Sequence, residues 1–158
     1  KLCGRRSATR SPRRTPRARN ALARAVDRFA SAPKLSVPGA SAWFERGVVA
    51  YSRESKLDLA PGVGPVLETH GAVSREFVHA LAEAMRLRAG CEHAIAESGI
   101  AGPQDGRRSS KAAGTAFIGL ASAAETLVEA CAFTGTRAEI MVQIADRALQ
   151  MLREAVET

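Results

Sequence analysis

Apolar residues recur at helical spacing after Ser74. Phe77, Leu81 and Met85 follow one another at four-residue steps and end shortly before Gly90. Serine is a favoured N-cap residue and glycine a favoured residue after the last helical turn. The pattern therefore predicts an amphipathic helix between Ser74 and Gly90.

A second apolar series lies near the C-terminus. Thr136 and Glu139 match a capping box, in which each side chain bonds the other residue's backbone N–H. Apolar residues follow at four-residue steps along one face: Ile140, Ile144, Ala148 and Leu152. We expect a long helix there. A shorter amphipathic helix is predicted over residues 21–32, ended by Pro33.

Short apolar stretches between these helices predict strands. They cover residues 47–52, 91–97, 115–120 and 127–133. Glycine-rich or polar sequence predicts loops at residues 62–65, 99–103 and 104–111. Because strands and helices alternate, we expect one layered α/β domain.

Positive charge is confined to the start of the chain. Residues 1–32 hold ten Lys/Arg and one acidic residue, a net charge of +9, whereas residues 33–158 hold thirteen basic and fifteen acidic residues, a net charge of −2. Residues 1–20 have so few apolar side chains that we expect them to be disordered. The acidic body argues against a nucleic-acid-binding domain.

Composition also bears on where the protein acts and on whether it binds a membrane or a metal. No apolar stretch reaches the roughly 18 residues that a membrane helix needs, so we expect a soluble, cytoplasmic protein without a membrane partner. The odd number of cysteines fits a reducing compartment, and Cys91 and Cys131 are predicted to be small core residues. Cysteines and histidines lack metal-ligand spacing, so we predict no metal site.

Three blocks of sequence together resemble one family. They are Val37–Ser52 continuing to Lys56, Thr69–Ser74, and Ser98–Pro103 followed by Gly114 and Thr115. Their order and spacing are similar to those of the CinA C-terminal domain, the nicotinamide-nucleotide amidase family, from about Leu35 to the C-terminus. The resemblance implies a single three-layer α/β/α domain with a mixed sheet, which forms a homo-oligomer.

The resemblance also implies an activity. The family hydrolyses the carboxamide of nicotinamide mononucleotide to nicotinic acid mononucleotide and ammonia, in pyridine nucleotide salvage, without a metal or organic cofactor. It implies Ser41 as nucleophile and Lys56 as base, acting directly or through Tyr51. Amide hydrolysis needs such groups, and a lysine serves as base only when a shifted pKa leaves it neutral. From residue type alone, Ser41 could instead be a turn serine, Tyr51 a strand-end aromatic and Lys56 a solvated charge.

The remaining site residues are assigned to substrate binding. Glycines let backbone N–H groups approach a phosphate or a carboxamide closely, although a plain glycine turn has the same sequence. Arg137 could pair with the nucleotide phosphate, or could be a solvated arginine in the first turn of the last helix. The substrate-binding set is Gly39, Ser98, Gly99, Ala101, Gly102 and Arg137.

One part of the family pattern is missing. The family has a strand ending in Glu-Ser-Cys-Thr-Gly-Gly before the Val37 block, and residues 1–34 stand in its place without that motif. This segment is either an out-of-frame translation or a genuine basic arm or leader. We therefore divide the chain into residues 1–34 and an amidase-like domain over residues 35–158. The alternative function is a catalytically impaired domain that serves as a ligand-binding or interaction module.

Overall fold

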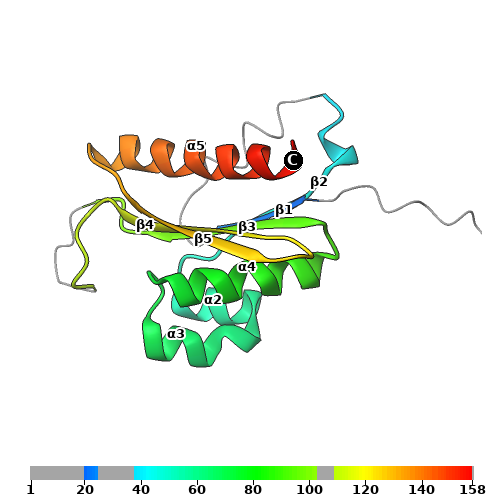
Figure 1. Ribbon diagram of the computed structural model, residues 1–158. Coiled ribbons are helices and arrows are strands. Elements are labelled where there is room, and N and C mark those ends of the chain that lie inside the picture. Colours follow the sequence, from blue (N-terminus) through cyan, green and yellow to red (C-terminus); the bar gives the residue numbers. More distant parts are fainter. Residues whose placement is uncertain (1–19, 25–37, 103–108, 158) are drawn as a thin grey trace, which may run out of the picture.

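A five-stranded sheet lies between two layers of helices (Figure 1). The computed structural model describes residues 20–24, 38–102 and 109–157, and only the backbone of 20–24. The strands are β1 (Asn20–Arg24), β2 (Phe44–Val49), β3 (His93–Gly99), β4 (Thr115–Ala121) and β5 (Thr126–Ala132). The α-helices are α2 (Arg53–Leu59), α3 (Gly64–His70), α4 (Arg75–Ala89) and α5 (Arg137–Val156), and the 3₁₀ turns are η1 (Ala40–Ala42) and η2 (Pro61–Val63).

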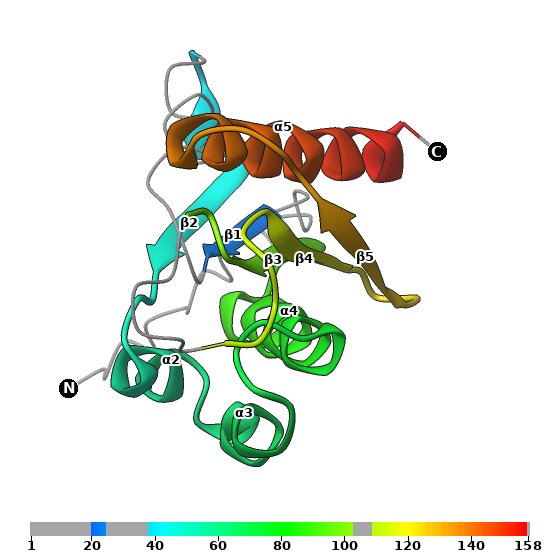
Figure 2. The same ribbon diagram turned by 90° about the vertical axis from the view of Figure 1, so that its left-hand side faces the viewer.

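The sheet is mixed, with the strand order β2-β1-β3-β4-β5. Strand β1 runs parallel to both β2 and β3, whereas β4 is antiparallel to β3 and to β5. The carboxyl ends of β2, β1, β3 and β5 therefore lie at one edge of the sheet. This edge is on the left in Figure 1 and faces the viewer in Figure 2.

Each face of the sheet has its own apolar core. Helices α2, α3 and α4 lie on one side and α5 lies on the other (Figure 1). Strand β3 shows how alternation divides its side chains, because Ala94 and Ala96 pack in the α4 core while Ile95 packs in the α5 core. The expected single α/β/α domain with a mixed sheet is confirmed.

The predicted helix ends are confirmed. The Ser74 hydroxyl accepts a hydrogen bond from the Phe77 N–H at 3.2 Å, and Gly90 ends α4 in the left-handed conformation with a φ of 60°. Thr136 and Glu139 form the complete capping box of α5. The four-residue apolar series of both helices are buried, so local signals and packing agree there.

The predicted helix over residues 21–32 is wrong where the structure describes it. Residues 21–24 belong to β1, which hydrogen-bonds to strands on both sides. A short apolar stretch does not distinguish helix from strand, and here pairing with two neighbouring strands decides. Residues 25–32, like 1–19, lie outside the described residues. The domain boundary at residue 35 stays a prediction, although β1 places an earlier segment in the sheet.

Two other predictions need correction near the first helical layer. The strand expected over residues 47–52 covers Phe44–Val49 instead, because Ser52 is the N-cap of α2. The residues expected to form a loop at 62–65 instead end η2 and begin α3, whose first turn contains Pro65. Proline has no N–H to leave unpaired in a first helical turn, so Gly-Pro here starts a helix.

Smaller shifts affect the other strands. The strand expected over residues 91–97 is β3, His93–Gly99, so Gly99 ends a strand rather than opening a turn. The strands expected at 115–120 and 127–133 are present as β4 and β5 within one residue at each end. In the described part of the chain, no helix is both long and apolar enough to cross a membrane.

Candidate active site

Most of the predicted site residues follow strands that end at the same edge of the sheet. Tyr51 comes two residues after β2, Gly102 three residues after β3, and Arg137 five residues after β5. Only β1 separates β2 from β3. Ligands of open α/β sheets commonly bind outside the carboxyl ends of parallel strands, so topology favours this edge as the site.

Lys56 is buried beside the end of β2. Its side chain lies in α2 and is 7% exposed, and its ammonium nitrogen Nζ donates to the Tyr51 carbonyl oxygen at 2.6 Å and to the Ser52 carbonyl oxygen at 3.4 Å. Burial lowers the pKa of Lys56 below its ordinary value of 10.5, and the Glu54 carboxylate opposes this by a smaller amount. Removing the ammonium from water favours the neutral amine, which is the form that can accept a proton.

The contact between Lys56 and Tyr51 runs through the main chain. The Tyr51 side chain is 67% exposed, whereas its carbonyl oxygen holds the lysine. The structure therefore brings the two residues together. The phenol remains accessible to a ligand at this edge.

Ser41 lies away from this pair. It is exposed in η1, which precedes β2, whereas Tyr51 and Lys56 follow β2. Six strand residues span about 20 Å, and Figure 2 shows η1 and α2 at opposite ends of β2. Gly39 is beside Ser41, with a φ of 81°. Within one chain, the structure does not bring Ser41 or Gly39 to the edge where Lys56 lies.

The turn after β3 packs closely against its neighbours. Ser98 is 1% exposed, and strand alternation directs it to the α4 side with Ala94 and Ala96. A Cβ atom on Gly99 would come within 2.8 Å of the Ala116 Cβ, so only glycine fits there without movement. The end of β3 is therefore closely packed where the turn begins.

Arg137 lies against the same turn. A Cβ atom on Gly102 would be 3.5 Å from the Arg137 guanidinium nitrogen Nη1, so the arginine side chain lies beside Gly102 and a larger residue there would touch it. Arg137 is exposed and begins α5, and in the described part of the chain no salt bridge pairs it with a carboxylate. Ala101 is 2% exposed and packs in the α5 core. The predicted Gly102 and Arg137 therefore do meet.

Comparison with known proteins agrees with this architecture. The family model described as the CinA C-terminal domain matches residues 30–156. The chain belongs to the CinA C-terminal domain family. A protein named nicotinamide-nucleotide amidohydrolase PncC from Enterobacter agglomerans is 39% identical over 123 residues, which are 77% of this chain and 74% of that protein.

Other CinA relatives are longer or have known structures. A CinA-like protein from Syntrophotalea carbinolica is 39% identical over 117 residues, 74% of this chain, and the match spans only 28% of that protein. The solved structure of a competence damage-inducible protein A from Klebsiella pneumoniae has a TM-score of 0.82 at 26% identity, covering 89% of this chain and 88% of its own.

In chain order, β1 stands where the resemblance described above implies a strand ending in Glu-Ser-Cys-Thr-Gly-Gly. In this chain β1 reads Asn-Ala-Leu-Ala-Arg. Its carboxyl end lies between the ends of β2 and β3.

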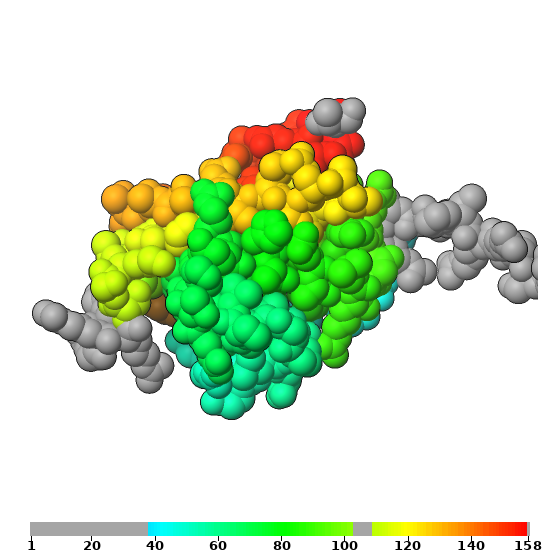
Figure 3. Space-filling model, turned by 60° about the horizontal axis from the view of Figure 1, so that its bottom comes forward, coloured from blue at the N-terminus to red at the C-terminus, as the bar shows by residue number. Residues whose placement is uncertain are grey.

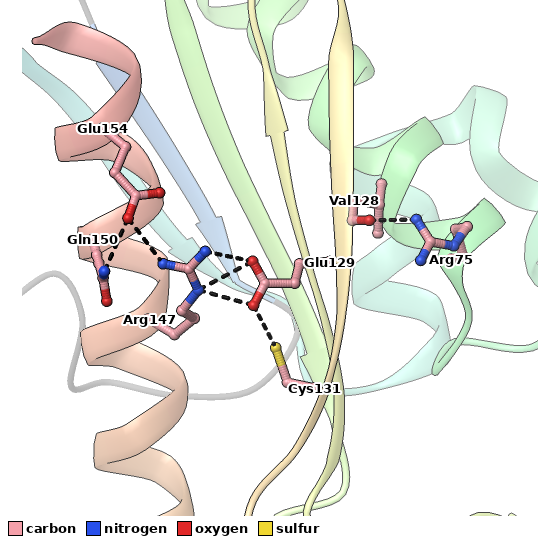
Figure 4. A network of polar contacts seen from close by, with 7 residues as sticks. All are labelled: Arg75, Val128, Glu129, Cys131, Arg147, Gln150 and Glu154. Carbon is pink, nitrogen blue, oxygen red and sulfur yellow. Dashed lines mark hydrogen bonds and ion pairs between the residues drawn. The ribbon is translucent and has the colours of Figure 1, made fainter. Parts of the chain in front are cut away.

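A groove of about 890 Å³ lies at the other end of β5, away from these residues. Figure 4 shows its central contact, in which the Arg147 guanidinium on α5 donates to both carboxylate oxygens of Glu129 on β5 at 2.6–3.0 Å. Glu154 accepts from the same arginine at 3.3 Å. Of the two arginines among the described residues that line the groove, Arg147 is paired with carboxylates and Arg75 donates to the Val128 carbonyl oxygen. Because both are engaged within the chain, this groove is a weaker candidate for a nucleotide than the carboxyl edge.

The cysteines fit this CinA domain as packing residues. Cys91 is buried and Cys131 is half-buried on β5, so the core prediction is confirmed for Cys91 and only partly for Cys131. Burial, and then the Glu129 charge, raise the pKa of the Cys131 thiol to about 11. Among the described residues, no group of three or more His, Cys, Asp or Glu side chains could hold a metal ion.

Replacing Arg147 with Met should lower the free energy of unfolding by about 1 kcal/mol at pH 7, since a two-pronged arginine–carboxylate pair exceeds an ordinary surface pair. The hydrogen bonds from Arg147 hold the pKa of Glu129 below 4.5. The Glu129 contribution is therefore present above pH 4.5 and is lost as pH falls through its lower folded pKa.

Urea unfolding of both proteins at pH 7 and at pH 3 measures this effect. The difference between wild type and Arg147→Met should shrink at pH 3. Arg153→Met is the matched control, because Arg153 forms an exposed pair with Glu157 one turn away and should change stability less than Arg147→Met does. An equal loss in both variants would mean that the Glu129 contact adds nothing.

Proposed function

We propose that this chain hydrolyses the carboxamide of nicotinamide mononucleotide to nicotinic acid mononucleotide and ammonia. The observation that carries the proposal is Lys56, a buried lysine with a lowered pKa at the carboxyl edge of the sheet. The name of the Enterobacter relative supports the substrate class. Membership in the CinA family supports the reaction at the level of the family.

Lys56 acts as the general base in this proposal. Neutral Nζ accepts a proton from the attacking oxygen, which forms a bond to the carboxamide carbon. The resulting ammonium gives this proton to the leaving nitrogen as the C–N bond breaks, so ammonia departs. If the attacking oxygen is water, the product is the carboxylic acid, which ionises; if it is a side-chain hydroxyl, the product is an ester, which water then hydrolyses with Lys56 again as base. The backbone carbonyls of Tyr51 and Ser52 hold Nζ in place for both transfers.

Arg137 and the turn at Gly102 bind the nucleotide. The guanidinium offers paired donors that match a phosphate, and it lies against Gly102 without a carboxylate partner among the described residues. Ser98, Gly99 and Ala101, which the sequence predicted to bind the substrate, shape the turn in this proposal, because Ser98 and Ala101 are buried. The exposed Tyr51 phenol donates to the substrate or relays the proton.

The attacking oxygen is either water or a side-chain hydroxyl. Ser41, the predicted nucleophile, lies at the far end of β2 from Lys56 in a single chain. We therefore expect Ser41→Ala to retain at least a third of wild-type kcat, measured as ammonia release at saturating nucleotide. A loss of more than 100-fold would instead show that Ser41 reaches Lys56, in an assembly of chains, and supplies the nucleophile.

Ammonia release by the purified chain tests the function itself. We expect release from nicotinamide mononucleotide, and nicotinic acid mononucleotide as the co-product by mass spectrometry. The absence of the family's Glu-Ser-Cys-Thr-Gly-Gly strand favours a second candidate, a catalytically impaired module. Nucleotide binding by calorimetry without any ammonia release would support that candidate and reject the amidase. Homo-oligomerisation and a cytoplasmic location also stay predictions.

A further inference from the structure

Lys111 joins the segment before β4 to the start of α4. Its ammonium nitrogen Nζ donates to the Val73 carbonyl oxygen and lies 5.2 Å from the centre of the Phe117 ring. Figure 3 shows residues 109–114, in yellow-green, against the green N-terminal part of α4. The ammonium is attracted both to the aromatic face of Phe117 and to the Val73 carbonyl oxygen. These two contacts link the segment before β4 to the start of α4.

On the α4 side, the Val73 carbonyl oxygen that accepts from Lys111 is tied to the buried start of the helix. Val73 precedes the N-cap Ser74, which is 4% exposed. The Ser74 hydroxyl donates to the Gly71 carbonyl oxygen at 2.8 Å and accepts from the Phe77 N–H at 3.2 Å. Phe77 is fully buried. The carbonyl that Lys111 binds is therefore fixed to the core by the helix cap.

The other side of the contact leads to the turn after β3. The Gly114 N–H donates to the Ile100 carbonyl oxygen at 2.6 Å, and the Ile100 N–H donates to the Thr115 carbonyl oxygen at 2.8 Å. Ile100 directly precedes Ala101 and Gly102. Two backbone hydrogen bonds therefore connect the end of residues 109–114 and the start of β4 to the turn that lies beside Arg137.

We infer that Lys111 is a positioning residue that holds the Ile100–Gly102 turn in its ligand-binding position by fixing residues 109–114 to α4. This role rests on the proposed function for its effect on turnover. The sequence alone placed Lys111 in a polar loop, because its hydrogen-bond partner Val73 lies 38 residues earlier in the chain. It acts through the turn and does not touch the reacting atoms.

Lys111→Met keeps most of the side-chain length and removes the charge. We expect KM for nicotinamide mononucleotide to rise about tenfold while kcat changes less than threefold, because the turn binds the nucleotide before and during the reaction alike. Lys111→Arg keeps a cation that can reach the carbonyl and stack on the ring, and should restore KM to within threefold of wild type. Arg153→Met, a surface cation on α5, is the control and should leave KM unchanged.

Hydrogen exchange of residues 109–117 tests the contact without any turnover. In the free protein we expect exchange in this segment to become at least fivefold faster in Lys111→Met, and to return toward wild type in Lys111→Arg. Unchanged exchange in Lys111→Met would overturn the inference, whether or not the chain is an amidase. Faster exchange without ammonia release from the wild type would reject the amidase and leave the positioning contact standing. The inference would also be overturned if residues 109–117 exchanged as fast in Lys111→Arg as in Lys111→Met.

Discussion

Lys56→Met should lower kcat for ammonia release about 1,000-fold, since positioned general bases contribute roughly 10²–10⁴ in rate. Methionine keeps the length and the apolar stem of lysine but cannot accept a proton. Nucleotide affinity by calorimetry should change little, because Nζ is held by backbone carbonyls of its own chain. The measurement is ammonia release at saturating nucleotide, alongside binding.

The pH profile provides an independent check of the same role. Turnover requires the neutral amine, so kcat should rise as pH rises through the folded pKa of Lys56, which lies below 10.5. The folded protein binds this proton less tightly than the unfolded chain does. Wild-type stability should therefore increase as pH rises from the folded pKa toward 10.5, and the Met variant should lack that increase.

Arg88→Met is the matched control for Lys56→Met. Arg88 on α4 also donates to backbone carbonyls of α2, those of Asp58 and Leu59. Unlike Lys56, it is exposed, and the carbonyls that it binds lie at the C-terminal end of α2. Its loss should leave kcat within threefold of wild type. If Lys56→Met kept more than a tenth of wild-type kcat, a deficit under about 1.4 kcal/mol, Lys56 would not be the base.

Local sequence signals predicted the helices that carry their own caps. Ser74, Gly90 and the Thr136–Glu139 box act within a few residues, so their physics is visible in the sequence. Helix α2 had no comparable apolar series, and its Arg-Glu-Ser-Lys stretch looked solvated. The burial of Lys56 depends on packing against distant segments, which a pattern of nearby residues does not contain.

The site was predicted in part for the same reason. The meeting of Gly102 with Arg137 follows from strand order, because β3 and β5 end at one edge of the sheet. Ser41 and Tyr51 are close in sequence but are separated by the full length of β2. An extended strand moves its two ends apart by about 3.3 Å per residue, so proximity in sequence was misleading there.

Gly114 is the position where a single methyl group should cost the most stability. Its φ is +88°, and a Cβ atom would lie 1.9 Å from the Phe133 carbonyl oxygen and 2.9 Å from the Phe133 carbonyl carbon. The clash is with backbone, which cannot rotate away as a side-chain tip can. Gly114 also accepts a hydrogen bond from the Phe133 N–H at 3.0 Å, so a shift of either strand end would weaken that bond.

Gly114→Ala should therefore lower the free energy of unfolding by about 2–5 kcal/mol, combining roughly 1–2 kcal/mol for a left-handed alanine with roughly 1–3 kcal/mol for the overlap. Urea unfolding followed by circular dichroism measures it. Gly62→Ala is the matched control, because a Cβ atom there meets nothing within 4 Å, and it should change stability by less than about 1 kcal/mol. A loss under about 1 kcal/mol in Gly114→Ala would mean that the ends of β4 and β5 separate easily. The close connection between Ile100, Gly114 and Phe133 would then be too weak to hold the turn beside Arg137.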